Sequence, residues 1–194
     1  MVRLSRIYTR SGDRGATRLA SGESVSKASP RVAAYGDVDE LNAVIGLARL
    51  AVDAALDARL GRIQNELFDL GADLATPEKA AGAPAALRIV AAQVARLEAE
   101  IDALNAELAP LNSFVLPGGT PAAAHLHHAR TVCRRAERSA VALVADIAAK
   151  GSDGAHAEAL RYLNRLSDLL FVMARVANAP AGAEPLWVPA ATRE

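Results

Sequence analysis

Several features are scarce in this sequence, and each absence narrows what the protein can be. Aromatic residues make up only 4% of the 194 residues, so the core must be built from the aliphatic residues that dominate a hydrophobic content of 52%. Ala and Leu are prominent among these residues, and both are among the best helix formers, which favours packed helices. A single cysteine, Cys133, excludes an intrachain disulfide and indicates a reducing compartment.

Excess charge and long apolar runs are missing too. The 22 basic residues are balanced by 22 acidic ones, so the net charge does not indicate binding to nucleic acid or to an anionic membrane surface. No apolar stretch approaches the ~18 residues of a membrane-spanning helix, and the start of the chain lacks the apolar segment of a secretory signal. We therefore expect a soluble cytoplasmic protein with one domain over residues 1–194.

Residues 1–34 differ in character from the rest of the chain. They are rich in Gly, Ser, Thr, Arg and Lys and show no sustained period, which predicts an ordered loop or a short extended piece over residues 7–19 and a flexible loop over 21–30. Asp37 and Glu40 then resemble a capping box, so we expect the first helix to begin there. The prediction is a helical bundle over residues 36–178, followed by a C-terminal tail over 179–194.

Five segments carry apolar residues at alternating steps of three and four. They cover approximately residues 37–48, 56–74, 87–108, 126–147 and 163–177. Short links between them predict an all-α fold, a five-helix bundle with ferritin-like up-down packing. Extended coiled coils would sustain their repeat without the Pro and Gly that interrupt this one. Cys133 falls on the apolar stripe of the fourth segment, which predicts a small buried side chain.

A glycine-containing segment near the N-terminus could bind phosphate. Gly12 and Gly15 would let backbone amides approach a ligand closely. Hydroxyl and guanidinium groups that could bind phosphate oxygens belong to Thr9, Arg10, Ser11, Arg14, Thr17 and Arg18. The pattern is neither a P-loop nor a dinucleotide-binding fingerprint. On the pattern alone, a plain surface turn is the better interpretation.

The fourth predicted helix carries a cluster of arginines. Arg130, Arg134, Glu137 and Arg138 would share one arc of this helix beside its apolar stripe. Like charges at this spacing repel one another unless anions compensate them. One interpretation is a solvated face on which Glu137 pairs with an arginine. The other is a site for a polyphosphate or for a carboxylate of another subunit, since arginine forms bidentate bonds with both groups.

Other polar and exposed positions leave two interpretations each. Asp39 and Asn42 would lie on a polar stripe of the first helix, either solvated or in a subunit contact. Phe114, in the loop before the fourth helix, could pack onto the bundle as a hydrophobic staple or face a ligand. Asn164 and Asp168 lie one turn apart on the fifth helix, and these two residues alone do not decide between a structural role and a place in a site.

The histidines do not form a metal-binding pattern. His125 and His128 lie three apart, but no third ligand follows at a usual spacing and no HExxH motif is present. We expect structural or solvated roles for them and predict no metal-ligating residue.

Six segments, taken in order, resemble the ATP:cob(I)alamin adenosyltransferases of the PduO type. They are residues 7–15, 35–42, 64–71, 114–119, 134–138 and 162–168. Each segment is modest alone, but six in this order, spanning residues 7–187, are highly specific. Ser11 stands where the family usually has threonine and keeps the hydroxyl group.

The resemblance implies an activity and an assembly. The enzyme would transfer the 5′-deoxyadenosyl group of ATP to the cobalt of cob(I)alamin, with Mg²⁺ bridging the phosphates, and release triphosphate. It would be a homotrimer with active sites between subunits, served by a reductase and by a B12-dependent mutase. Two alternatives stay open at this point: a protein that binds adenosylcobalamin and delivers it to a mutase, and a structural bundle whose arginines join subunits.

The resemblance also implies roles for individual residues. ATP would be bound by Thr9, Arg10, Ser11, Gly12, Thr17, Arg18 and Lys27 of the N-terminal region and by Arg134, Arg135, Glu137, Arg138 and Asn164 of the bundle. Asp39 would pair with Arg134 across the subunit interface, so that Asp39, Arg134 and Arg138 serve catalysis. Phe114 would face the corrinoid and displace its lower axial ligand.

Overall fold

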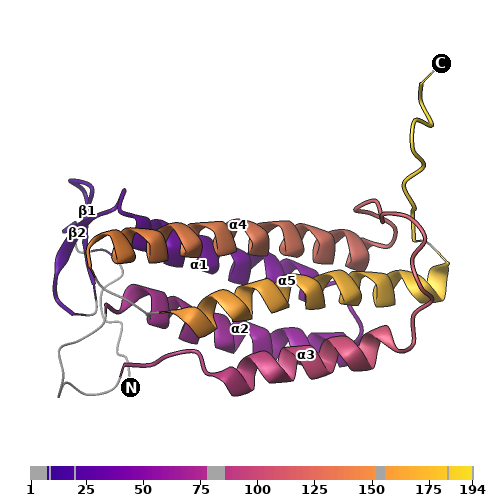
Figure 1. Ribbon diagram of the computed structural model, residues 1–194, viewed down its shortest axis with the longest axis horizontal. Coiled ribbons are helices and arrows are strands. Elements are labelled where there is room, and N and C mark those ends of the chain that lie inside the picture. The colour runs from indigo at the N-terminus through magenta and orange to yellow at the C-terminus, as the bar shows by residue number, and fades with distance from the viewer. Residues whose placement is uncertain are drawn as a thin grey trace.

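The fold is an all-α bundle whose successive helices alternate in direction, as predicted (Figure 1). The computed structural model describes residues 8, 10–19, 21–77, 86–151, 156–182 and 184–193. The elements are β1 (Ala16–Arg18), β2 (Ser24–Ser26), α1 (Pro30–Arg49), α2 (Ala54–Ala75), α3 (Ala91–Asn105), α4 (Pro121–Ala149), α5 (Ala157–Asn178) and the 3-10 turn η1 (Ala179–Ala181). α1 packs against α2 and α4, and α5 packs against α3 and α4. None of the helices in these ranges has the length and apolarity needed to cross a bilayer.

The core follows the predicted three-and-four stripes. Leucine and isoleucine from all five helices and the ring of Tyr162 are buried in one cluster. Small residues on α4, among them Ala136 and Ala140, allow neighbouring backbones to approach closely. Cys133 is buried as predicted, and its thiol lies 3.3 Å from the carbonyl oxygen of Leu163. Burial raises the pKa of this thiol well above its ordinary value, so it stays protonated and unreactive.

The first helix begins earlier than predicted. The hydroxyl of Ser29 caps α1 by accepting a hydrogen bond from the Val32 amide, and Pro30 occupies the first turn, where its missing N–H costs nothing. Asp37 therefore lies inside the helix, and the predicted capping box with Glu40 is wrong. The carboxylate of Asp37 instead accepts a hydrogen bond from Ser139 of α4. The Ser-Pro start was missed because the first turn of α1 carries little apolar periodicity.

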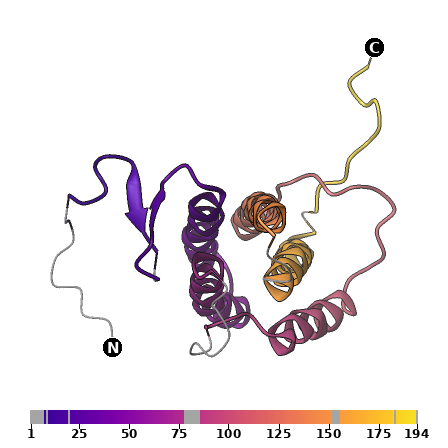
Figure 2. The ribbon, with the colours of Figure 1, turned by 60° about the vertical axis from the view of Figure 1, so that its left-hand side comes forward.

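The N-terminal region contains a short hairpin: β1 is the extended piece allowed within residues 7–19, whereas β2 lies where a flexible loop was predicted. β1 and β2 pair antiparallel, with Thr17 opposite Val25. The hairpin lies beside the end of the bundle where α1 begins and α4 ends (Figures 1 and 2). It therefore forms a small two-stranded unit next to the helices.

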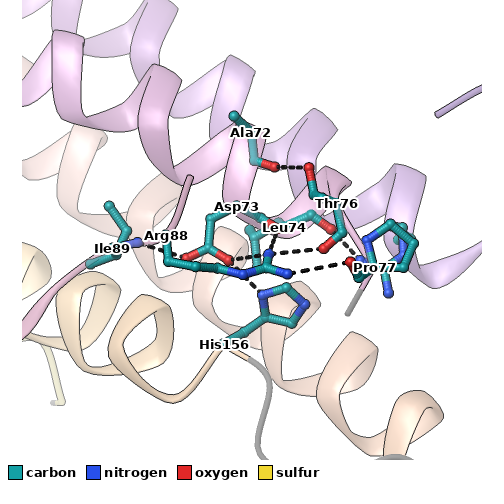
Figure 3. Close-up of polar contacts among 9 residues, drawn as sticks. Ala72, Asp73, Leu74, Thr76, Pro77, Arg88, Ile89 and His156 are labelled. Carbon is teal, nitrogen blue, oxygen red and sulfur yellow. Dashed lines mark hydrogen bonds and ion pairs between the residues drawn. The ribbon is translucent and has the colours of Figure 1, made fainter. Parts of the chain in front are cut away.

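A buried carboxylate joins three parts of the chain at the same end of the bundle (Figure 3). Asp73, near the end of α2, accepts hydrogen bonds from the Ile89 amide at 2.8 Å, from Arg88 Nη1 at 2.9 Å and from His156 Nδ1 at 2.7 Å. Burial by itself would raise the pKa of Asp73, but the hydrogen bonds from His156, Ile89 and Arg88 outweigh it and lower the pKa. The charged form of Asp73 therefore stabilises the fold.

This cluster gives a stability prediction. Asp73→Asn should lower the free energy of unfolding at pH 7 by about 3 kcal/mol, because a buried ion pair loses one partner. The pKa of Asp73 is lower in the folded protein than in the unfolded chain. The carboxylate therefore stabilises the fold fully above the ordinary pKa of Asp, and this stabilisation is lost as the pH falls through the folded pKa. Urea unfolding at pH 7 and at lower pH should show the two proteins converging on acidification. The matched control is Asp57→Asn. Asp57 lies on α2, as Asp73 does, but its ion pair with Arg49 of α1 is more exposed, so the free energy of unfolding should change little. An equal loss in both variants would contradict this role for Asp73.

Candidate active site

Predicted site residues of α4 form an arginine face on the surface of the bundle. Arg134 and Arg138 are exposed, and Arg138 Nη1 donates to the carbonyl oxygen of Arg134 at 3.0 Å. Glu137 accepts a hydrogen bond from Asn164 Nδ2 of α5 at 3.1 Å. The structure thus brings Arg134, Glu137 and Arg138 of α4 together with Asn164 of α5 on one surface.

The positive charge of this face is not balanced from within the described chain. In the described ranges, no carboxylate forms an ion pair with Arg134 or Arg138, and Glu137 is bonded to Asn164 rather than to an arginine. Arg130, half-buried beside them, has its pKa lowered by burial and then by the charge of Arg134. The interpretation of a solvated face neutralised by Glu137 is therefore not what the structure shows. Uncompensated guanidinium groups of this kind suit an anionic ligand.

Arg135 lies apart from this face. Its guanidinium forms an ion pair with Glu40 of α1 and lies 4.0 Å from the carboxylate of Asp37. One residue along a helix turns the side chain by ~100°, which separates Arg135 from Arg134. The guanidinium thus ties α4 to α1, and its predicted contact with ATP stays a prediction.

The N-terminal hairpin brings together residues that are distant in the sequence. The Lys27 amide donates to the carbonyl oxygen of Gly15 at 2.8 Å, and the Gly15 amide donates to that of Gly12 at 3.2 Å. A Cβ atom at Gly12 would lie 3.0 Å from Lys27 Nζ, so the ammonium group lies directly over this glycine. Gly15 adopts a positive φ of 77°, which favours glycine. The result is a tight turn with a lysine charge above it.

The other predicted residues of this region surround the same turn. Thr17 and Arg18 lie on β1, and Arg10 lies in the turn with its guanidinium 5.7 Å from the centre of the Tyr8 ring. Ser11 also lies in the turn. Thr9 lies outside the described residues.

Within the described residues of one chain, the hairpin and the arginine face lie apart. No hydrogen bond or ion pair among the described residues joins residues 10–27 to Arg134 or Arg138. The hairpin lies beside the C-terminal end of α4, while Arg138 is eleven residues before that end, or ~16 Å along the axis (Figure 1). The two halves of the predicted nucleotide site therefore remain separate in the single chain.

Asp39 lies on a different surface of α1 from Asp37. It is exposed and borders a groove of about 410 Å³ between α1 and α2, with Tyr35, Asn42 and Phe68 among the lining residues. The Phe68 side chain is 72% exposed there. Asp39 forms no ion pair among the described residues. Its predicted pairing with Arg134 would therefore need a second copy of the chain.

The Phe114 loop lies at the opposite end of the bundle from the hairpin and is bound to the C-terminal tail. Phe114 is 76% exposed, so the interpretation of a staple packed on the bundle is wrong. Its ring lies 5.9 Å from that of Trp187, and the Trp187 amide donates to the carbonyl oxygen of Phe114 at 2.8 Å. Sequence reasoning missed this partner because the tail shows no helical period. The signal that could have found it is the apolar run of residues 186–188 between two prolines, which favours extended backbone.

The sequence model of the cobalamin adenosyltransferases matches residues 7–177 of this chain. The chain belongs to the cobalamin adenosyltransferase family. It is 50% identical to the corrinoid adenosyltransferase of Mycobacterium tuberculosis over 200 residues, covering 99% of this chain and 97% of the relative. It is 44% identical to that of Bacillus subtilis, covering 91% of this chain and 89% of the relative.

Solved structures agree with this membership. A variant of the PduO-type ATP:corrinoid adenosyltransferase from Lactobacillus reuteri, complexed with cobalamin and ATP, has a TM-score of 0.82 and 38% identity to this chain, covering 94% of this chain and 99% of that one. The predicted family, fold and activity are confirmed. This adenosyltransferase moves the adenosyl group of ATP to cobalamin, and the two alternatives without enzymatic activity are set aside.

Proposed function

We propose that the adenosyltransferase reaction takes place between two subunits, where the arginine face of α4 in one chain meets the N-terminal hairpin of another. The observation that carries this proposal is the pair of exposed, unpaired guanidinium groups of Arg134 and Arg138 on one surface, with the lysine-covered glycine turn held on a separate unit. Each half offers cations and neither encloses a ligand alone.

In this arrangement the two halves bind opposite sides of the triphosphate chain. Arg138 and Arg134 contact phosphate oxygens from the bundle. Beside them, the hydrogen bond between Asn164 and Glu137 joins α5 to α4. Lys27 reaches the phosphates as a point charge, and the Gly12 turn brings backbone amides close to them. The hydroxyls and guanidinium groups of Thr9, Ser11, Arg10, Thr17 and Arg18 complete the cover.

The chemistry requires positioning and charge stabilisation. The electron pair of Co(I) attacks the 5′ carbon of ATP in line, a cobalt–carbon bond forms, and the bond from that carbon to the phosphate oxygen breaks with triphosphate as leaving group. Co(I) is itself the nucleophile, so no general base is needed. Charge accumulates on the leaving phosphate oxygen, and preorganised guanidinium groups stabilise it as it develops. Orientation of the two substrates supplies the rest of the acceleration.

Mg²⁺ fits this site as a companion of the phosphates. In the described residues no three His, Cys, Asp or Glu side chains form a metal-binding group. The sequence pattern predicted no metal ligand, but Mg²⁺ commonly uses one or two carboxylates with phosphate oxygens and water, and Glu137 is the carboxylate that the arginine face offers it. When bound, the ion supplies charge neutralisation along the phosphate chain.

Assembly as a homotrimer would complete the interface. Asp39 of one subunit would pair with Arg134 of the next, which would bury the groove between α1 and α2 and its exposed Phe68. Phe114, exposed at the end of α4 where that helix begins, would form an apolar wall for the corrinoid. The reaction needs a source of Co(I), for which we propose a reductase as partner, and a B12-dependent mutase would receive the adenosylcobalamin. A reducing cytoplasm suits the free thiol of Cys133.

A direct assay tests the reaction. The protein is incubated with ATP, Mg²⁺ and chemically reduced cobalamin, and the Co(I) absorbance should decay as adenosylcobalamin forms. A folded trimer that produces no decay would contradict the proposal.

Subunit mixing tests where the site lies. Arg138→Ala and Lys27→Ala should each be nearly inactive, because each removes charge from one half of the site. Mixed and allowed to exchange subunits, they should regain activity at about a quarter of the interfaces, namely those that join an intact α4 to an intact hairpin. The control is each variant mixed with itself. If the mixture stays as inactive as its components although exchange is shown by mass, both halves belong to one chain.

A further inference from the structure

One buried guanidinium joins three segments at the Phe114 end of the bundle. Arg175, in the last turn of α5, is only 7% exposed. Its Nε donates to Oε1 of Glu184 in the C-terminal tail at 2.8 Å, and its Nη2 donates to the carbonyl oxygen of Ala109 at 2.8 Å and to Glu184 Oε2 at 3.4 Å. The side chain therefore holds α5, the connection between α3 and α4, and the tail in one arrangement.

The same turn of α5 also anchors the far end of that connection. Asn178 is fully buried, donates to the carbonyl oxygen of Gly118 at 3.0 Å and accepts from the Thr120 amide at 2.9 Å. The Thr120 hydroxyl donates to the carbonyl oxygen of Ala177 at 3.2 Å. Both ends of the segment that carries Phe114 are thus attached to residues 175–178, and its apolar tip projects between them.

The tip itself is held by the tail. The Leu116 amide donates to the carbonyl oxygen of Pro185 at 2.8 Å, and the Trp187 amide donates to that of Phe114 at 2.8 Å. Ser113 Oγ donates to the carbonyl oxygen of Trp187 at 2.6 Å. This pairing is short and exposed, and isolated strand pairs of this size are marginal in water. It needs an anchor on the bundle.

Glu184 has the features of this anchor. A two-oxygen contact with a guanidinium is among the stronger polar interactions, and here the two side chains are only 7% and 24% exposed. Removing one partner of a pair this well shielded is costly, because the other charge stays buried without compensation. The pair also lies directly before the segment that touches Phe114.

We propose that Arg175 and Glu184 are positioning residues that hold the C-terminal tail against the Phe114 loop and so fix Phe114 and Trp187 for the corrinoid. The inference rests on the proposed contact of Phe114 with the corrinoid. Neither charged residue touches the substrate; both act through the tail. With the pair intact the binding-competent loop is the populated state, and without it the loop spends much of its time unpaired.

Glu184→Gln tests this, because it keeps the size of the side chain and removes its charge. Trp187 is the single tryptophan of the chain, so its fluorescence reports the docking of the tail without any substrate. We expect acrylamide to quench Trp187 more strongly in the variant. If the docked fraction falls to a fifth, the KM for the corrinoid should rise about fivefold, since apparent affinity scales with the competent fraction. The KM for ATP should stay as in the wild type.

Two further variants make the result decisive. Glu158→Gln breaks a more exposed arginine pair on the same helix, with Arg161, and should leave both the quenching and the KM for the corrinoid unchanged. Glu184→Asp keeps the charge on a shorter side chain and should recover part of the wild-type quenching. The proposal is overturned by unchanged quenching in Glu184→Gln, by equal rises in both KM values, or by a KM effect without a change at Trp187. Quenching is measured on the free protein, so it tests the tail anchor even if the corrinoid proves to bind elsewhere.

Discussion

Replacing Arg138 with alanine should lower kcat roughly a hundredfold, the usual effect of removing one group that stabilises developing charge in a transition state. Arg138 is exposed, and within the described residues its guanidinium donates a hydrogen bond to the Arg134 carbonyl oxygen and forms no ion pair, so the bundle loses little when it is removed. The melting temperature without ligand should therefore stay within a few degrees of the wild-type value. Stopped-flow decay of the Co(I) absorbance measures the rate, and thermal melting measures the fold.

Two further variants show whether the fall in kcat of Arg138→Ala is specific to this position. Arg161→Ala removes an exposed arginine from α5 and should leave kcat unchanged. Arg138→Lys keeps the charge but loses the planar fork, so it should fall between the wild type and alanine. Saturating ATP should also raise the melting temperature of the wild type, since a ligand at 100 times its dissociation constant adds ~2.7 kcal/mol. A normal rate in Arg138→Ala would remove this residue from the site.

Phe114→Ala should separate the two oxidation states of cobalt. The ring is 76% exposed and supports no core packing, so ATP affinity and stability should stay near normal. An apolar wall that displaces the lower axial ligand makes Co(II) easier to reduce, a step that chemically prepared Co(I) does not need. We expect the Co(II)-dependent reaction to slow at least about tenfold more than the Co(I)-dependent one, since an apolar side chain of this size contributes on the order of 1.5–3 kcal/mol to a buried contact.

The measurement is a pair of rates on one protein preparation, one with a reductase and Co(II) and one with prereduced Co(I). Leu87→Ala is a suitable control, because Leu87 is 55% exposed and precedes α3, at the opposite end of the bundle from Phe114 (Figure 1). Equal slowing of both reactions by Phe114→Ala would count against the role in displacing the axial ligand. Together with the Glu184 variants, this experiment distinguishes the loop from the anchor that holds it.

Much of the fold follows from local patterns in the sequence. The alternation of three and four fixes which residues of each helix face the core, because a helix repeats every 3.6 residues whatever surrounds it. For that reason the all-α bundle and the burial of Cys133 could be predicted. The start of α1 could not be predicted from the same signal, because Ser29 and Pro30 begin this helix by capping chemistry and not by apolar periodicity.

The candidate site, like the fold, was predicted in part from the sequence and decided in part by tertiary structure. The sequence shows that arginines crowd α4 and that a glycine turn precedes the helices, and the resemblance of six short segments indicated the chemistry. Which arginine stays free was decided by tertiary structure: Arg135 is drawn to Asp37 and Glu40 of α1, while Arg134 and Arg138 remain unpaired within the described chain.

The tail, the Phe114 loop and the Asp73 cluster depend on tertiary structure alone. Trp187 reaches Phe114 at one end of the bundle, and Asp73 binds Ile89, Arg88 and His156 at the other, only after the helices have packed and brought distant segments together. The sequence by itself determined the helices, their buried faces and the family. Packing determined which charges are neutralised and which loops are held, because those depend on contacts between residues far apart in the chain, and no local pattern encodes them.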